Sequence, residues 1–330
     1  MVEAKWDVVG IGNAIVDVLA QADDSFIAGQ GMAKGAMNLI DADRAEALYK
    51  AIGPAVEQSG GSAANTIAGL ASLGGKSAYV GKVANDQLGD IFAHDLRAAG
   101  IHFNTSRLVG DAPTARSFIL ITPDGQRTMN TYLGACVALT PDDVDAETVS
   151  GGQVLYLEGY LWDRPAAKQA FLKAARLAHR AGRKVALTLS DSFCVERHHE
   201  SFLDLVKNHV DILFANEAEI RALYGTATFD EALGVVRKLG KTAALTRSEK
   251  GSVVVDADAV HVIEPTPVAH VVDTTGAGDL YAAGFLYGMT HGLGLEKAGR
   301  IASIAAGEVI SHVGPRPQVK LADLIKGIAA

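Results

Sequence analysis

Short apolar runs that end at glycine or turn residues alternate with longer segments of helical periodicity along this chain. Runs of the first kind are typical of buried strands, and apolar positions three and four residues apart are typical of helices. The predicted strands are 7–12, 15–20, 34–40, 77–81, 116–121, 127–132, 154–158, 185–189, 211–214, two that flank a loop at 243–251, and one that ends at 271–272. The predicted helices are 41–51, a run between Gly60-Gly61 and Gly74-Gly75, 89–99, 165–181, 201–206, 217–224, 280–286 and 298–310.

From residue 140 onward, strands and helices alternate regularly. Repeated strand–helix units favour a parallel sheet with helices on both faces and ligands at the carboxyl ends of the strands. Earlier in the chain, Pro123-Asp124-Gly125 marks the turn of a hairpin. We expect this hairpin to join strands 13–20 and 34–40 in a lid that excludes water from a pocket. The expected fold class is therefore α/β, one domain over 1–330 with a doubly wound, mostly parallel sheet and a small β-sheet lid from about 13–40 and 114–134.

The amino-acid composition argues against nucleic-acid-binding, disulfide-rich and membrane-spanning proteins. The net charge of −8, without a basic run, argues against nucleic-acid binding. Only two cysteines are present, which indicates no disulfide framework and a cytoplasmic protein. No apolar segment at the start predicts a secretory signal, and none approaches the ~20 residues that a membrane helix needs. We therefore expect a small-molecule substrate and neither a nucleic-acid nor a membrane partner.

The segment Asp273-Thr274-Thr275-Gly276-Ala277-Gly278-Asp279 lies where a buried helix begins. The first N–H groups of a helix have no intrahelical partner, so they form a site that attracts anions. Asp279 is the second acidic residue in this run. It lies at the amino end of the helix, where the free N–H groups favour a bound anion. It either caps the helix or acts as a base beside a group whose negative charge the amides hold.

Two glycine-rich segments partly match known nucleotide-binding motifs. Gly10 and Gly12 follow a strand, but the third glycine of a dinucleotide-binding turn and the helix after it are missing. Gly74-Gly75-Lys76-Ser77 resembles the end of a P-loop, but Leu70 occupies the position of its first glycine. Both nucleotide motifs are therefore rejected.

Three polar residues elsewhere stand among apolar neighbours. Asn13 and Asp17 flank a predicted strand, where as isolated residues they would cap or solvate a turn. Asn65 lies in an apolar helix opened by Gly60, Gly61 and Ser62, so its amide needs a partner. That partner is either a neighbouring loop or a ligand.

Taken together, the runs 273–279 and 60–74 resemble the two signatures of the PfkB family, the ribokinase-like carbohydrate and nucleoside kinases. Their order and their spacing of about 200 residues make the pair specific. Asn216-Glu217-Ala218-Glu219 resembles the family's Asn-x-x-Glu motif. The loop from Thr246 to Gly251 resembles its Thr-x-Gly-x-x-Gly segment, although Ser248 replaces the middle glycine. The spacing of Asn13 and Asp17 is more similar to the adenosine kinase branch than to ribokinase.

The resemblance implies a role for each matched residue. Asp279 is the expected catalytic base, the amides of Gly276, Ala277 and Gly278 are the anion hole, and Arg127 reaches the transferred phosphate. The acceptor is expected to contact Asn13, Asp17, Gly60, Gly61, Ser62 and Asn65. Asn216, Thr246 and Gly251 are expected on the ATP side, Glu219 near the hydration shell of Mg²⁺, and Asp273 with Thr275 near a monovalent cation (K⁺). The cofactors implied are ATP and Mg²⁺, with K⁺ as a further one.

We therefore expect transfer of a phosphoryl group from ATP to a primary hydroxyl, with adenosine as the preferred acceptor. Apolar and aromatic walls for a base are expected from Met37, Leu39, Met129, Tyr160 and Leu161. A sugar kinase for ribose or fructose, and a non-catalytic binding protein, are the alternatives. The chain is expected to be a monomer, or a homodimer formed through the lid.

Overall fold

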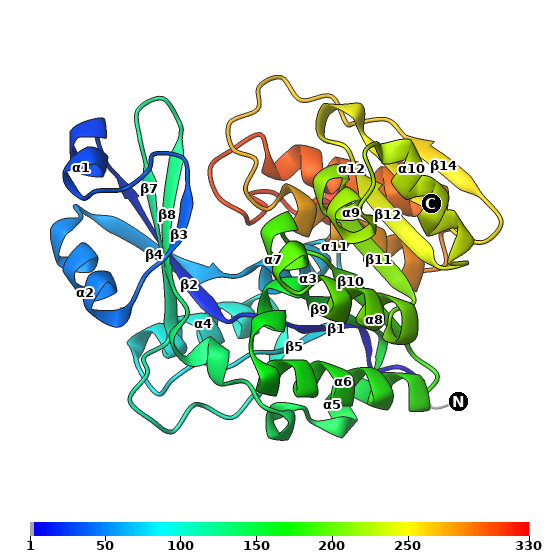
Figure 1. Cartoon of the computed structure of the whole chain (residues 1–330), viewed down its shortest axis with the longest axis horizontal. Coiled ribbons are helices and arrows are strands. Elements are labelled where there is room, and N and C mark those ends of the chain that lie inside the picture. The colour runs from blue at the N-terminus through cyan, green and yellow to red at the C-terminus, as the bar shows by residue number, and fades with distance from the viewer. Residues whose placement is uncertain (1–2, 330) are drawn as a thin grey trace.

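A computed structural model describes residues 3–329 and contains two β-sheets (Figure 1). The larger sheet has the order β14-β13-β12-β11-β10-β9-β1-β5-β6 and is parallel except at β13 and β14. Its strands are β1 (Trp6–Ile11), β5 (Ser77–Val80), β6 (His102–Phe103), β9 (Gly152–Glu158), β10 (Lys184–Thr188), β11 (Ile212–Asn216), β12 (Thr242–Thr246), β13 (Ser252–Val255) and β14 (Val260–Ile263). The sequence therefore predicted the α/β class and the mostly parallel sheet correctly.

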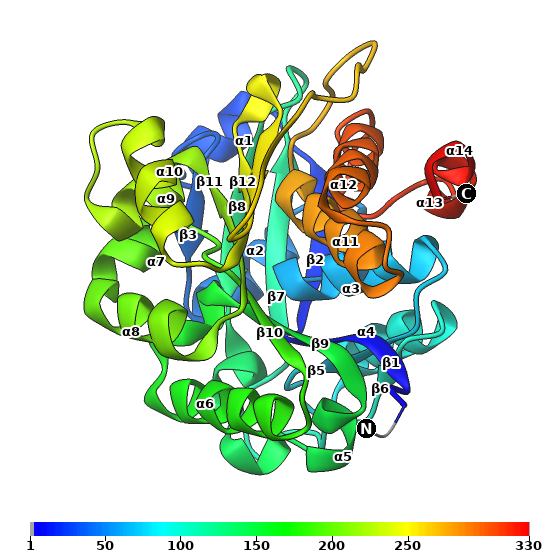
Figure 2. The same ribbon diagram turned by 90° about the vertical axis from the view of Figure 1, so that its right-hand side faces the viewer.

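Helices cover both faces of the larger sheet (Figure 2). One face packs against α3 (Ser62–Ser72), α4 (Gln87–Ala98), α11 (Ala277–Thr290) and α12 (Leu295–Val309). The other packs against α5 (Ala146–Ser150), α6 (Pro165–Arg180), α7 (Ser192–Arg197), α8 (His199–His209), α9 (Glu217–Tyr224) and α10 (Phe229–Lys238). The short helices α13 (Leu321–Leu324) and α14 (Lys326–Ala329) follow. No helix among residues 3–329 is long and apolar enough to cross a membrane.

The smaller sheet has the order β3-β8-β7-β2-β4 and stands beside the main body (Figure 1). Its strands are β2 (Ile15–Gln21), β3 (Met37–Leu39), β4 (Ala55–Gly60), β7 (Ala115–Ile121) and β8 (Arg127–Tyr132). The helices α1 (Asp24–Gly29) and α2 (Ala42–Ala51) cover one face through a small core that includes Val18, Leu48 and Phe118. Side chains alternate along these strands, so Asp17 and Arg127 project from the opposite face to this core.

Several predicted boundaries were wrong. Strand β4 was not predicted, because its exposed and polar residues have no apolar alternation and form a strand only by pairing with β2. The predicted strand 34–40 is reduced to Met37–Leu39. No strand ends at Val271-Val272, whose side chains are exposed. The predicted helix 201–206 extends over all of α8, and α1 was missed.

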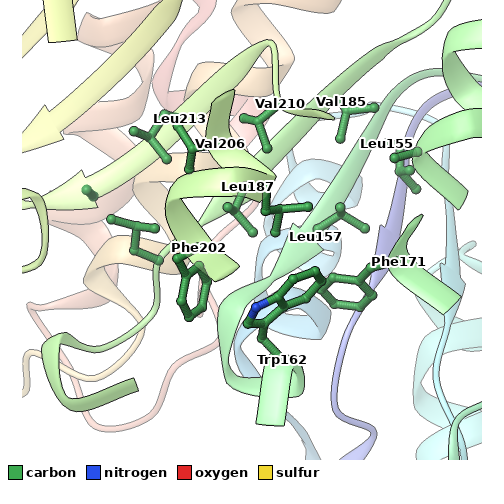
Figure 3. Packing of buried hydrophobic residues seen from close by; sticks show 14 of the residues in the cluster. Leu155, Leu157, Trp162, Phe171, Val185, Leu187, Phe202, Val206, Val210 and Leu213 are labelled. Carbon is green, nitrogen blue, oxygen red and sulfur yellow. The ribbon is translucent and has the colours of Figure 1, made fainter. Parts of the chain in front are cut away.

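An aromatic cluster in the core fixes the segment that leaves β9. Trp162 lies 5.7 Å from Phe171 and 5.9 Å from Phe202 between ring centroids (Figure 3). Its indole N–H donates to Ser201 Oγ at 2.9 Å. This packing anchors the 3₁₀ segment Gly159–Asp163, in which Tyr160 and Asp163 are partly exposed.

Candidate active site

Asp279 lies in the first turn of α11 and is held by side chains of α3. Ser62 Oγ donates to Asp279 Oδ1 at 2.7 Å, and Asn65 Nδ2 donates to Asp279 Oδ2 at 3.0 Å. Within residues 3–329 the Asp279 carboxylate accepts no hydrogen bond from the backbone of its own helix. The arrangement therefore disfavours simple helix capping and joins the two signature segments at one carboxylate.

Burial sets the protonation behaviour of Asp279. Loss of solvation raises the pKa of this carboxyl group, and the hydrogen bonds from Ser62 and Asn65 oppose that rise. A carboxylate with a raised pKa is a better proton acceptor near neutral pH than an ordinary aspartate. Asn65 Oδ1 is buried without a hydrogen-bond partner in the part of the chain described. An acceptor ligand with a donor group would satisfy that oxygen.

The amino end of α11 presents free amide groups beside Asp279. The helix begins after Gly276, which has φ +80° and lies against Pro315. Among the described residues, the N–H groups of Gly276, Gly278 and Asp279 donate to no protein acceptor. Ala277 differs from expectation, because its N–H donates to the Thr274 carbonyl oxygen at 3.2 Å. A Cβ at Gly278 would meet no atom within 4 Å, so the space beside this residue is open.

Arg127 connects the smaller sheet to the same turn. Its Nη2 lies 2.6 Å from Asp273 Oδ2, and both side chains are buried. The contact is a close ion pair without hydrogen-bond alignment, since neither Nη group of Arg127 donates within residues 3–329. Asp273 also accepts from the N–H groups of Thr275 and Gly314, each at 3.0 Å. Both Asp273 oxygens thus have partners, and the monovalent-cation role of Asp273 and Thr275 remains a prediction.

The carboxylate of Asp17 accepts no hydrogen bond from the described residues, although only 6% of this residue is exposed to solvent. Desolvation raises its pKa to about 7, and the positive charges of Arg316 and Arg127 oppose this shift. Gly60 is required beside it, because a Cβ there would lie 2.2 Å from Asp17 Oδ2. A buried and unpaired carboxylate is suited to binding hydroxyl groups of a ligand.

Glu158, at the end of β9, was missed in the sequence. Its carboxylate accepts from Asn13 Nδ2 at 2.7 Å, from Asn13 N at 3.3 Å and from Ala63 N at 2.8 Å. Burial raises its pKa to about 7. Asn13 is therefore positioned by Glu158, and the amino end of α3 with it. An acidic residue closing an apolar strand was the only signal of this role in the sequence.

Arg316 was also missed. It lies in the loop after α12, and its Nη2 donates to Ser59 Oγ at 3.2 Å beside Gly60. Burial raises the pKa of both Asp17 and Asp279, and the positive charge of Arg316 opposes that rise at each carboxylate. Arg316 Nε is a buried donor without a protein partner among the residues described.

A second group of predicted residues lies at the ends of β11 and β12. Asn216 and Glu219 form a capping box at the start of α9, with Asn216 Nδ2 donating to Glu219 Oε1 at 2.7 Å. Burial raises the pKa of Glu219 to about 7, and the negative charges of Asp191 and Asp279 add to the rise. No cluster of three or more His, Cys, Asp or Glu residues in the described part of the chain forms a ready metal site. A hydrated cation at these carboxylates would relieve their repulsion.

Ser248 keeps the backbone conformation of a glycine. Its φ is +52°, and Gly251 after it has φ +73°. A Cβ at Gly251 would lie 2.1 Å from the Ile263 carbonyl oxygen. The replacement of the middle glycine by serine therefore leaves a left-handed turn between Thr246 and Gly251, at a cost of about 1–2 kcal/mol for a residue with a side chain.

We expect Ser248→Gly to leave the melting temperature unchanged or to raise it. The relief of the left-handed strain and the greater entropy of glycine in the unfolded chain act in opposite directions. Thermal unfolding measures the result, with Glu249→Gly as the control in the same turn. Glu249 has a negative φ, so that variant should lose about 0.5–1 kcal/mol of stability. A larger loss for Ser248→Gly than for Glu249→Gly would contradict the expectation.

A cavity of about 360 Å³ opens beside Asn13. Its apolar lining comes from Leu39, Leu133, Val137, Tyr160 and Leu161, and its polar lining from Asn13, Asp163, Arg164, Arg197 and His198. Leu39, Tyr160 and Leu161 thus line one cavity, and their role as walls for a base remains a prediction. Met129 and Met37 pair with each other in β8 and β3 and are not among the lining residues.

The three raised pKa values make stability depend on pH. Asp17, Glu158 and Glu219 hold protons up to about pH 7 in the folded protein but release them near pH 4 when unfolded. Stability from these groups is present at low pH and is lost as pH rises from about 4 through 7. We expect the free energy of unfolding, measured with urea, to fall by a few kcal/mol from pH 5.5 to 8. Glu219→Gln should flatten this slope, and a rise in stability over the same window would contradict it.

Known proteins resemble this chain over nearly its full length. The pattern of the pfkB family carbohydrate kinases matches residues 34–321. The structure of an adenosine kinase from Sinorhizobium meliloti is 57% identical and has a TM-score of 0.91, covering 98% of this chain and 99% of that one. A probable sugar kinase from Rhizobium etli CFN 42 is 52% identical with a TM-score of 0.92 and the same coverage. An adenosine kinase of Saccharomyces cerevisiae is 26% identical over an alignment of 329 residues, and the match covers 93% of this chain and 95% of the relative.

Proposed function

Because this chain belongs to the pfkB family of carbohydrate kinases and is a kinase, we propose that it transfers the terminal phosphoryl group of ATP to the primary hydroxyl of a purine nucleoside, adenosine above all. The observation that carries the proposal is that a held base, free amides at the start of α11 and an unpaired carboxylate lie near one another, with Asp17 and Asp279 close enough for their charges to interact. Asp279, Gly278 and Asp17 represent these three parts.

Each part has a defined task in the reaction. Asp17 binds the neighbouring hydroxyls of the ribose and so directs the primary hydroxyl toward Asp279. Asp279 accepts the hydroxyl proton as the oxygen attacks phosphorus, while Ser62 and Asn65 keep its carboxylate in place. The free amides at the start of α11 hold the negative charge of the phosphoryl oxygens, and Arg127 supplies a positive charge from the smaller sheet.

Mg²⁺ fits the carboxylates at the ends of the strands. Glu219 and Asp191 lie close enough for their charges to act on each other, and the negative charge of Asp191 adds to the raised pKa of Glu219. Glu219 and Asn216 would hold the hydration shell of the ion, and the ion would neutralise the phosphate groups of ATP. Thr246 and Gly251 lie at the end of β12, where the turn exposes backbone to the same nucleotide.

We expect adenosine to have a kcat/KM well above those of ribose and fructose. The cavity offers apolar walls that a purine base covers and a free sugar leaves exposed to water, and burial contributes about 25 cal/mol per Å². ATP consumption with each acceptor and identification of the product measure this. Higher kcat/KM for ribose or fructose would favour the sugar-kinase alternative, which the similarity to the probable sugar kinase supports. Absence of turnover with every acceptor would leave the non-catalytic alternative.

A further inference from the structure

The cavity beside Asn13 has a charged end. Asp163, Arg164, Arg197 and His198 come from two elements, the 3₁₀ segment after β9 with the start of α6, and the junction of α7 and α8. The other walls are apolar except for Asn13. Asn13 lies just before β2, the strand that carries Asp17, so a ligand with its ribose at Asp17 and its base in the cavity would direct the far edge of the base toward these four side chains.

Both carboxylate oxygens of Asp163 accept hydrogen bonds from the neighbouring side chains Arg197 and His198. Arg197 Nε lies 3.0 Å from Asp163 Oδ1, and Arg197 Nη2 lies 3.1 Å from Oδ2. His198 Nε2 lies 2.5 Å from Asp163 Oδ1, while its Nδ1 lies 3.4 Å from Lys168 Nζ, which can only donate. His198 therefore donates through Nε2 and accepts through Nδ1. The cluster leaves neither a free carboxylate oxygen nor a free imidazole N–H for a ligand.

Arg164 is the remaining charged group. Its side chain forms no hydrogen bond and no ion pair with any residue in 3–329, and this side chain is exposed and lines the cavity. The neighbouring Asp163 is already paired with Arg197, so the charge of Arg164 is not compensated locally. The Arg164 guanidinium thus adds five N–H donors without a protein partner to this end of the cavity, where both oxygens of Asp163 are already paired.

We propose that Arg164 is a specificity-determining residue that donates to the acceptor edge of a 6-oxopurine, so that inosine and guanosine are accepted as well as adenosine. This rests on the proposed nucleoside kinase function. Guanine and hypoxanthine present two acceptors, O6 and N7, to which a guanidinium can donate in bidentate fashion. Adenine presents only N7 there, next to an amino group that is a donor. An arginine at this edge therefore favours the oxo bases.

Steady-state kinetics of wild type, Arg164→Gln and Arg176→Gln with adenosine, inosine and guanosine test the assignment. Arg176 is an exposed arginine on the same helix outside the cavity lining, so its variant controls for the loss of one positive charge. We expect Arg164→Gln to lower kcat/KM for inosine and guanosine about tenfold, through KM, and for adenosine less than threefold. The kcat with each nucleoside should change little, because Arg164 is remote from the phosphoryl group. Arg176→Gln should match wild type.

The outcomes separate two hypotheses. Wild type that phosphorylates adenosine but neither inosine nor guanosine would overturn the role of Arg164, as would an equal loss for all three nucleosides in Arg164→Gln. Phosphorylation of ribose or fructose without any nucleoside would instead overturn the proposed function itself. 7-Deazainosine, which lacks the N7 acceptor, adds a direct probe. Its O6 still accepts one hydrogen bond, so its kcat/KM in wild type should lie between the inosine values of wild type and Arg164→Gln, and Arg164→Gln should lower it less than it lowers that of inosine.

Discussion

Asp279→Asn should lower kcat by about 10²–10⁴ while leaving the affinity for both substrates nearly unchanged. Loss of a general base removes an effect of about this size. Asparagine has almost the same shape, so the hydrogen bond from Ser62 to the side-chain oxygen can persist, and α11 keeps its packing on α3. Stopped-assay kinetics with adenosine and calorimetric binding of adenosine measure the two parts. A variant that keeps more than half of the wild-type kcat would show that Asp279 is not the base.

Ser62→Ala provides a second, independent test of Asp279 as the general base. The hydrogen bond from Ser62 lowers the pKa of Asp279, so its removal should raise that pKa further. The acidic limb of the pH profile of kcat should then move to higher pH, with little change of the plateau. Thr66→Ser, on the same helix, retains the hydroxyl group there and should leave the limb unmoved. A limb that stays in place in Ser62→Ala would argue that another group limits the reaction at low pH.

Asp17→Asn should raise the KM for adenosine by about 10²-fold or more without weakening ATP binding. Hydrogen bonds to a charged group contribute about 1.5–3 kcal/mol each, and the carboxylate can accept from two ribose hydroxyls. The same substitution should not lower the melting temperature at pH 8. Asp17 is ionised there at a desolvation cost, which is why its pKa is raised to about 7, and a neutral amide avoids that cost.

The KM for adenosine and the melting temperature of Asp17→Asn together distinguish a substrate-binding role of Asp17 from a structural one. Calorimetry with adenosine and with an ATP analogue, together with thermal unfolding, gives all three quantities on one sample. If the variant loses ATP affinity as much as adenosine affinity, Asp17 does not bind the nucleoside specifically. A marked loss of stability would show that Asp17 mainly serves the fold through Arg316.

Local patterns in the sequence were enough to predict the α/β class, the hairpin of β7 and β8, and the turn into α11 with Asp279 in its first turn. Each depends on residues that are near one another in the chain, such as glycines at a turn or apolar residues at strand spacing. The left-handed turn at Ser248 also persists locally, although a serine occupies it.

Only the tertiary structure decided which side chains surround Asp279 and Asp17. Ser62 and Asp279 are 217 positions apart, and Glu158 lies 145 positions from the Asn13 that it holds. No periodicity encodes such contacts, because they depend on how α3, α11 and the carboxyl ends of the strands meet in space. Strand β4 and the pairing of Arg127 with Asp273 have the same origin. The roles of Glu158 and Arg316 became visible only when burial and charge were known for every neighbour, since each acts through groups far away in the chain.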